Sequence, residues 1–204
     1  MELWHDRILV LDFGSQYTQL IARRIREAQV YSQILPCTVP LASVLAYRPQ
    51  GIVLSGGPSS VYEKKAPSVS KQLFEQGIPV LGICYGMQLV THLTGGAVAK
   101  SKHREYGRAE LTIDDASDLF AGIGKDGSTV VWMSHRDRIG RMPEGFRAIA
   151  HTSNSPVAAM KRDDGTQRIY CLQFHPEVAH TPDGARLLRN FVYDICGCKP
   201  TWTM

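Results

Sequence analysis

The sequence lacks the features that mark membrane, secreted or repetitive proteins. No run of about 18 apolar residues occurs, so no membrane-spanning helix is expected. Residues 1–7 have neither the basic nor the apolar region of a signal peptide. We find no internal repeat and no low-complexity segment. The net charge of +4 is small and the basic residues are scattered, so neither a nucleic-acid nor a membrane partner is expected.

Cysteine is scarce, and its pattern fits reduced thiols. The count is odd, which argues against a disulfide framework and favours a cytoplasmic protein. Cys196 and Cys198 lie close together, but no second Cys or His pair stands at zinc-finger spacing, so no metal site is expected. With 204 residues, 44% hydrophobic and 21% charged, the chain fits one globular domain. The five cysteines are Cys37, Cys84, Cys171, Cys196 and Cys198.

The stretch from Gly77 to Gln88 has the strongest chemical signal. Its apolar run at 78–83 predicts a buried parallel strand, and the residues after Cys84 predict a helix. The pattern Gly82-x-Cys84-x-Gly86 is typical of a nucleophile elbow, a sharp turn that requires small residues on both sides of the nucleophile. At the helix N-terminus the dipole and the free N–H groups would favour a thiolate and a developing oxyanion. Burial as an inert thiol is the alternative, and the glycine frame argues against it.

The first half of the chain alternates strand and helix patterns. Strands are expected at 7–14, 30–35, 51–55 and 78–83, and helices at 15–29, 41–47, 68–76 and after residue 84. This alternation predicts an α/β fold, with a mostly parallel central sheet and helices on both faces. Ligands of such sheets bind at the carboxyl ends of the strands, where Gly14, Gly56, Gly57 and Cys84 all fall.

The second half consists of short strand-like pieces at 108–113, 129–133, 147–151, 157–160 and 169–174. Turn signals such as Asp163-Asp164-Gly165 separate them. We expect additional short antiparallel strands that extend the sheet or form a small second one. Residues 183–196 are expected to close the chain as an amphipathic helix.

A cysteine nucleophile requires a base and a group that orients the base. His175 follows the strand-like run 170–174, and Glu177 lies two residues beyond it, where a carboxylate can fix the imidazole tautomer. His135, within the segment 133–137, is the rival base. The loop 55–58 contains Gly56 and Gly57, whose N–H groups can face an oxyanion. It lacks the Gly-Lys-Ser/Thr ending of a phosphate-binding loop.

Three segments resemble the signatures of class I, triad-type glutamine amidotransferase domains. They are Ser55-Gly56-Gly57-Pro58, Gly82-Ile83-Cys84-Tyr85-Gly86-Met87-Gln88 and Phe174-His175-Pro176-Glu177. Residues 11–24, 132–135 and 175–181 extend the similarity to the glutaminase domains of GMP synthetases. The resemblance covers residues 8–202, nearly the whole chain.

This resemblance implies that the chain hydrolyses glutamine without a cofactor. It makes Cys84 the nucleophile, His175 the general base and acid, and Glu177 the orienting carboxylate. It implies oxyanion N–H groups from Gly57 and Tyr85. The implied glutamine-binding residues are Gly56, Gln88, Ser134, His135 and Asp137. One position departs from the family, which often has glycine where this chain has Arg136.

The resemblance also implies a partner that uses ATP and Mg²⁺. In the family, ammonia passes to an ATP-pyrophosphatase domain that adenylates xanthosine monophosphate and aminates it to GMP. We expect residues 1–197 to form the amidotransferase domain, and 198–204 to begin a linker to such a domain, which the sequence does not contain. The alternatives are a free-standing glutaminase subunit, the glutaminase of another amidotransferase, as in anthranilate or CTP synthesis, and a non-catalytic binding or regulatory module.

Overall fold

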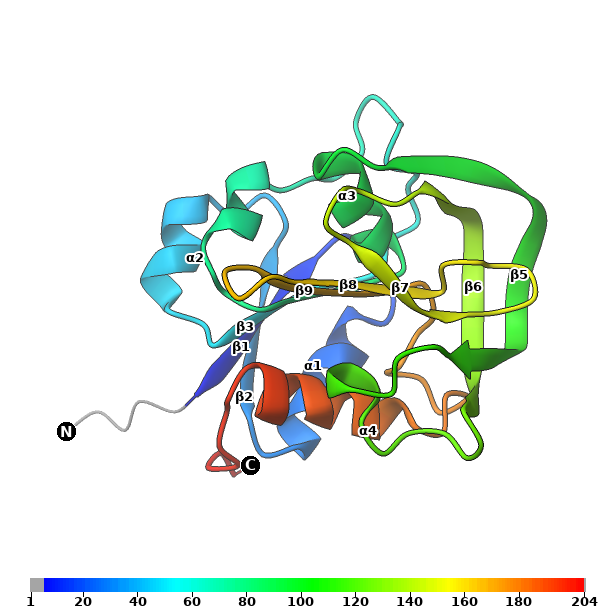
Figure 1. The fold of residues 1–204 in the computed structure, drawn as a ribbon. Coiled ribbons are helices and arrows are strands. Elements are labelled where there is room, and N and C mark those ends of the chain that lie inside the picture. Colours follow the sequence, from blue (N-terminus) through cyan, green and yellow to red (C-terminus); the bar gives the residue numbers. More distant parts are fainter. Residues whose placement is uncertain (1–5, 204) are drawn as a thin grey trace.

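The computed structural model describes residues 6–203, and the side chains of all of these except residues 101–104. Its strands form one nine-stranded sheet with the order β2-β1-β3-β4-β9-β8-β7-β5-β6 (Figure 1). Strands from β2 to β9 in this order pair in parallel, and the remaining neighbours pair antiparallel. The strands are β1 (Arg7–Asp12), β2 (Tyr31–Pro36), β3 (Gly51–Leu54), β4 (Val80–Ile83), β5 (Ala97–Ile113), β6 (Ser128–Arg141), β7 (Arg147–His151), β8 (Ala159–Asp163) and β9 (Arg168–Leu172).

Helices cover both faces of the central strands, because successive strand residues are apolar and buried and point alternately to opposite sides. Ile8 and Val10 of β1 belong to the core cluster of α1 and α4, whereas Leu9 and Leu11 belong to that of α2 and α3. The predicted α/β class is therefore confirmed. The helices are α1 (Thr18–Glu27), α2 (Leu41–Tyr47), α3 (Tyr85–Leu93) and α4 (Gly184–Arg189), with the 3-10 turns η1 (Lys71–Glu75) and η2 (Asp118–Phe120) and the π-helical η3 (Asn190–Ile195).

β9 is the main departure from the predicted sheet, since it pairs antiparallel to its sequence neighbour β8 on one side but parallel to β4 on the other. After β4 the chain runs through β5 to β8, and only then does it return to the centre of the sheet as β9 (Figure 1). Local periodicity shows which residues of a strand are buried, but it does not show which strand lies beside it. The consequence is functional: the carboxyl ends of β4 and β9 lie side by side, and Cys84 and His175 follow them.

Three further elements differ in length from the prediction. β5 and β6 are 17 and 14 residues long, whereas short strands were expected. The polar half of β6, from Ser134 to Arg141, has no run of alternating apolar residues, and its pairing with β5 keeps it extended. Residues 68–76 form only the 3-10 turn η1, because so short a segment gains little from helix propagation.

The residues after η3 pack on the body of the domain. The Cys198 N–H donates to the Val192 carbonyl over 2.9 Å, and the Trp202 N–H donates to the Gln29 carbonyl over the same distance. All five cysteines are free thiols. Within residues 6–203, no helix combines the length and the apolar character needed to cross a membrane.

Candidate active site

Cys84 lies at the sharp turn between β4 and α3, as the nucleophile-elbow pattern predicts. Its φ angle is +52°, in the left-handed region that side-chain-bearing residues rarely adopt. The Cys84 N–H donates to the Leu172 carbonyl over 2.7 Å, which fixes the turn to the end of β9. Strained backbone of this kind is concentrated at functional sites. The turn directs the thiol into a pocket at the carboxyl end of the sheet.

Gly82 and Gly86, two residues before and after Cys84, must be glycine because backbone atoms of other residues lie very close to them. A Cβ atom on Gly82 would lie 2.8 Å from the carbonyl carbon of Gly86. A Cβ atom on Gly86 would lie 2.5 Å from the Leu54 carbonyl oxygen, so β3 itself limits the size of this residue. The small residues of the motif therefore allow the helix to start directly against β3 and β4.

Gly86→Ala is expected to lower the free energy of unfolding by about 1–3 kcal/mol, the usual cost of overpacking a dense interior. Helix propensity alone would give the opposite sign, since alanine is favoured over glycine by about 1 kcal/mol inside a helix. Urea unfolding of both proteins measures the difference. An unchanged or raised stability would mean that α3 does not pack on Leu54 as closely as described.

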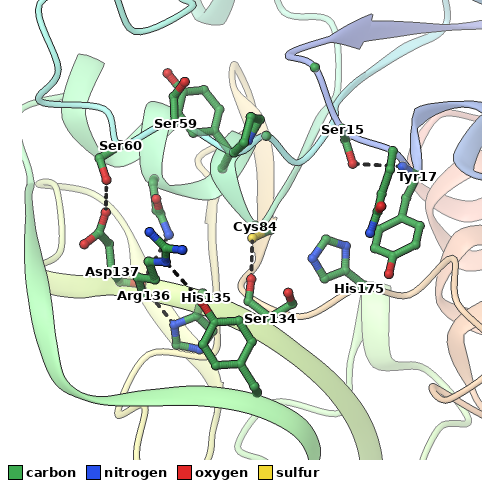
Figure 2. A pocket seen from close by; sticks show the side chains of 17 residues that line it. Ser15, Tyr17, Ser59, Ser60, Cys84, Ser134, His135, Arg136, Asp137 and His175 are labelled. Carbon is green, nitrogen blue, oxygen red and sulfur yellow. Dashed lines mark hydrogen bonds between the residues drawn. The ribbon is translucent and has the colours of Figure 1, made fainter.

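His175 and Glu177 form a buried pair beside the thiol. His175 Nδ1 lies 2.7 Å from Glu177 Oε1, and Glu177 is fully buried. The Thr181 hydroxyl donates to the His175 carbonyl over 2.7 Å and holds the turn after β9. Since Nδ1 faces the carboxylate, Nε2 is the nitrogen left for Cys84, and Figure 2 shows the His175 ring on one side of the Cys84 sulfur.

The protonation of His175 depends on its two neighbours. Burial disfavours the imidazolium, but hydrogen bonds to Cys84 and Glu177, together with the negative charges of these groups, raise the pKa of His175 to about 10. The ring is therefore an imidazolium at neutral pH as long as a thiolate lies beside it. Such a cation can donate a proton to a leaving group.

His135, the rival base, is turned away from Cys84 by its own partners. Its Nδ1 lies 3.0 Å from the Asp137 carbonyl oxygen, and its Nε2 lies 3.2 Å from Glu105 Oε2. The Glu105 carboxylate also accepts hydrogen bonds from the hydroxyls of Thr152 and Ser155, over 2.9 and 2.7 Å. This buried network spans β5, β6 and the loop after β7, and sequence reasoning did not identify it. The geometry favours His175 as the base.

A pocket of about 350 Å³ gathers the residues that the sequence singled out. Gly56 is not among the lining residues but lies next to His175. A Cβ atom on Gly56 would lie 3.2 Å from His175 Cε1, so the glycine leaves room for the imidazole. Predicted site residues that line the pocket are Gly57, Cys84, Tyr85, Gln88, Ser134, His135, Asp137 and His175. Lining residues that were not predicted as site residues are Gly14, Ser15, Gln16, Tyr17, Pro58, Ser59, Ser60, Tyr106 and Arg136.

Gly57 and Tyr85 border the pocket as candidate oxyanion donors. Tyr85 begins α3, so its N–H has no acceptor within the helix. A Cβ on Gly57 would lie 2.8 Å from the Phe13 carbonyl oxygen, which leaves space for glycine only. Two N–H groups beside a nucleophile are the arrangement that stabilises a tetrahedral oxyanion.

The opposite wall contains the residues expected to bind the substrate. Gln88 Nε2 donates to the Asp137 carbonyl over 3.2 Å, and the Cys84 thiol lies 3.7 Å from the Ser134 carbonyl oxygen (Figure 2). The Asp137 carboxylate accepts from the hydroxyls of Ser60 and Tyr62 over 2.6 and 2.7 Å. The segment 59–62 thus holds Asp137 in place.

The sequence contained usable signals for some of the unpredicted residues. Residues 14–17 follow the first strand at its carboxyl end, where ligands of parallel sheets bind. The Tyr17 ring meets the His175 ring edge-on, with 5.3 Å between centroids. Nothing local marks Tyr62 or Tyr106. No group of three or more His, Cys, Asp or Glu that could hold a metal ion occurs among the described residues.

Comparison with known proteins places the chain in a family. The sequence model of the class-I glutamine amidotransferases matches residues 9–195. Two glutamine-hydrolysing GMP synthases, from Gloeobacter violaceus and from a Nostoc species, are each 53% identical to this chain. The similarity covers 98% and 99% of this chain, respectively, and this chain spans 36% and 37% of the lengths of these relatives. A crystal structure of a Thermoplasma acidophilum protein, provisionally described as part of a GMP synthase, has a TM-score of 0.84 and 32% identity, with 95% of each chain covered. The chain belongs to the class I glutamine amidotransferase family.

Proposed function

We propose that this chain hydrolyses L-glutamine to glutamate and ammonia, with Cys84 as nucleophile, His175 as general acid and base, and Glu177 as the carboxylate that orients His175. One observation carries the proposal: a thiol on a strained elbow opens into a pocket beside a buried histidine–carboxylate pair. The reaction needs no cofactor, because the thiolate supplies the nucleophile and the imidazolium supplies the acid.

In the first half of the reaction the Cys84 thiolate attacks the side-chain amide carbon of glutamine. The carbonyl oxygen becomes an oxyanion, for which the N–H groups of Gly57 and Tyr85 are the donors. His175 gives its proton to the amide nitrogen, the carbon–nitrogen bond breaks, and ammonia leaves. A glutamyl thioester on Cys84 and a neutral His175 remain.

In the second half His175 acts as a base. Thioester formation removes the thiolate, which is one of the two neighbours that raise the pKa of His175. The neutral imidazole then takes a proton from water, whose oxygen attacks the thioester carbonyl. Collapse of this adduct releases glutamate and restores the thiolate and the imidazolium. Glu177 holds the ring in one orientation through both halves.

The ammonia, we propose, serves the amination of xanthosine monophosphate to GMP in a separate ATP-pyrophosphatase domain that requires ATP and Mg²⁺. The names of the relatives support this assignment, and so does their length, since this chain spans little more than a third of them. In this proposal residues 198–204 lead toward that domain. The free state of all five thiols supports a cytosolic location.

Glutamate release, measured with and without the synthetase domain, ATP, Mg²⁺ and xanthosine monophosphate, tests the proposal. We expect slow hydrolysis by this chain alone and a rate at least tenfold higher with the loaded partner, about 1.4 kcal/mol of transition-state stabilisation. The loop that contains Gly57 and the segment of β6 from Ser134 to Asp137 are the expected movable parts, since a shift of about 1 Å in a catalytic group can cost about 100-fold.

Cys84→Ala together with the loaded partner is the control, and it should release no glutamate. The absence of hydrolysis under either condition would contradict the proposed function. Equal rates with and without the partner would contradict the coupling and would favour a self-sufficient glutaminase.

A further inference from the structure

Arg136 is a charged residue of the pocket wall that the proposed chemistry does not use. It lies on β6 between His135 and Asp137, and its side chain is exposed at the pocket that contains Cys84. Its Nε donates to the Tyr106 hydroxyl over 3.3 Å, and Tyr106 lines the same pocket. The tyrosine thereby gives a long, flexible cation one preferred direction.

The guanidinium of Arg136 has capacity left for a ligand. Among the described side chains, no carboxylate lies within ion-pair distance of it. The bond to Tyr106 uses Nε, and the terminal nitrogens make no hydrogen bond with any described residue. A guanidinium presents its donors as a planar fork that matches the two oxygens of a carboxylate. Arg136 is therefore suited to an anionic group in the pocket.

The position of Arg136 fits the far end of a glutamine molecule. Figure 2 shows His175 on one side of Cys84, with Arg136 and Asp137 on the other. An amide that reacts at Cys84 must turn its leaving nitrogen toward His175, so the rest of the substrate extends toward the opposite wall. That wall offers a cation at Arg136 and an anion at Asp137. The head group of a free amino acid contains one charge of each sign.

We propose that Arg136 binds the α-carboxylate of the substrate and selects α-amino acids that carry a side-chain amide over simple amides. This inference rests on the proposed glutamine hydrolysis and names a determinant of its specificity. Tyr106 is a positioning residue, because it orients the guanidinium through Nε. Arg136 does not touch the reacting atoms, so its contribution belongs to substrate binding and not to the chemical step.

Steady-state kinetics with two substrates tests the assignment. One is L-glutamine, and the other is 4-aminobutanamide, which is glutamine without its α-carboxylate. Arg136→Ala is expected to raise the KM for L-glutamine by roughly tenfold or more, with kcat changed by less than about threefold. Its KM for 4-aminobutanamide should not change. Where turnover of this amide is too slow, its inhibition constant against glutamine replaces the KM.

Two further variants test whether the effect depends on the charge of Arg136 and on its position in the pocket. Arg136→Gln keeps a hydrogen-bonding side chain of similar size without the charge, and it should raise the glutamine KM as Arg136→Ala does. Arg138→Ala removes the same charge from the same strand at a position that does not line the pocket, and it should leave the KM unchanged. Circular dichroism verifies that each variant is folded.

The outcomes separate this inference from the function on which it rests. A wild-type glutamine KM in both Arg136 variants, with normal hydrolysis, overturns the inference alone. An equal rise of KM in Arg138→Ala also overturns it, because the effect would then be one of general charge. A wild-type chain that releases no glutamate even with the loaded synthetase domain overturns the proposed function, and the inference with it.

Discussion

Cys84→Ala is expected to abolish the release of glutamate from glutamine while the protein remains folded. Loss of the sulfur removes the only atom that we propose as a nucleophile, and catalysis through a thioester cannot proceed without it. The folded state should tolerate the change, because apart from its interaction with His175 the thiol has long contacts, 3.7 Å to the Ser134 carbonyl oxygen and 3.9 Å to Gln173 Nε2. Glutamate release and urea unfolding measure the two effects separately.

Covalent labelling of the wild-type protein tests the same assignment of Cys84 as the nucleophile. A chloroketone that mimics glutamine is expected to alkylate Cys84 and to leave the other four cysteines unlabelled. Burial raises the pKa of each of those four thiols, so they are protonated and enclosed at neutral pH. Peptide mass spectrometry locates the label, and excess glutamine should protect against it. Alkylation of Cys37 or Cys171 in place of Cys84 would refute the assignment.

Loss of the His175 imidazole is expected to lower kcat by several powers of ten, because the members of a triad act as a unit. His135→Ala should affect mainly the KM for glutamine, since His135 contacts the Asp137 carbonyl and Glu105 rather than Cys84. Glu177→Gln should cost less than loss of His175, because the base remains while its orientation weakens. The comparison of kcat among these variants identifies the base, and a larger loss of kcat in His135→Ala would mean that we have chosen the wrong histidine.

The His175 variant has to be designed around its buried partner. His175→Ala alone would leave the Glu177 carboxylate fully buried without its only side-chain partner among the described residues, and breaking such a pair costs about 3–5 kcal/mol. We therefore pair it with the double variant His175→Ala/Glu177→Gln, in which no charge remains. Glu177→Gln is its matched control, since the two differ only at His175. Loss of activity in a folded double variant then reports on the base and not on unfolding.

A proton titration of His175 tests the arrangement without any turnover. Nuclear magnetic resonance should find its pKa well above the ordinary value of 6.5, close to the value of about 10 that the two neighbours produce. The pKa should fall in Cys84→Ala and in Glu177→Gln, because each change removes one anionic partner of the imidazolium. A pKa that is unaffected by Cys84→Ala would mean that the histidine and the thiol do not interact.

Some features of this protein follow from residues that are close together in sequence. The nucleophile elbow needs Gly82, Cys84 and Gly86, and the reason is local crowding of backbone at one turn. The pairing of His175 with Glu177 spans two residues and one turn. The α/β class follows from periodicity, since apolar residues at 8–11 and 52–54 must be buried whichever strands lie beside them. These features could therefore be predicted from the sequence.

Other features were decided only by tertiary structure, because they depend on which strands become neighbours. β9 enters the sheet beside β4, and this parallel pairing is what brings His175 to Cys84. The buried carboxylate of Glu105 draws His135 away from the thiol, and hydroxyls of Ser60 and Tyr62 hold Asp137. Contacts of this kind join segments far apart in the chain, and hydrophobic periodicity has no information about them: it records how deeply a residue is buried, not which partner it meets.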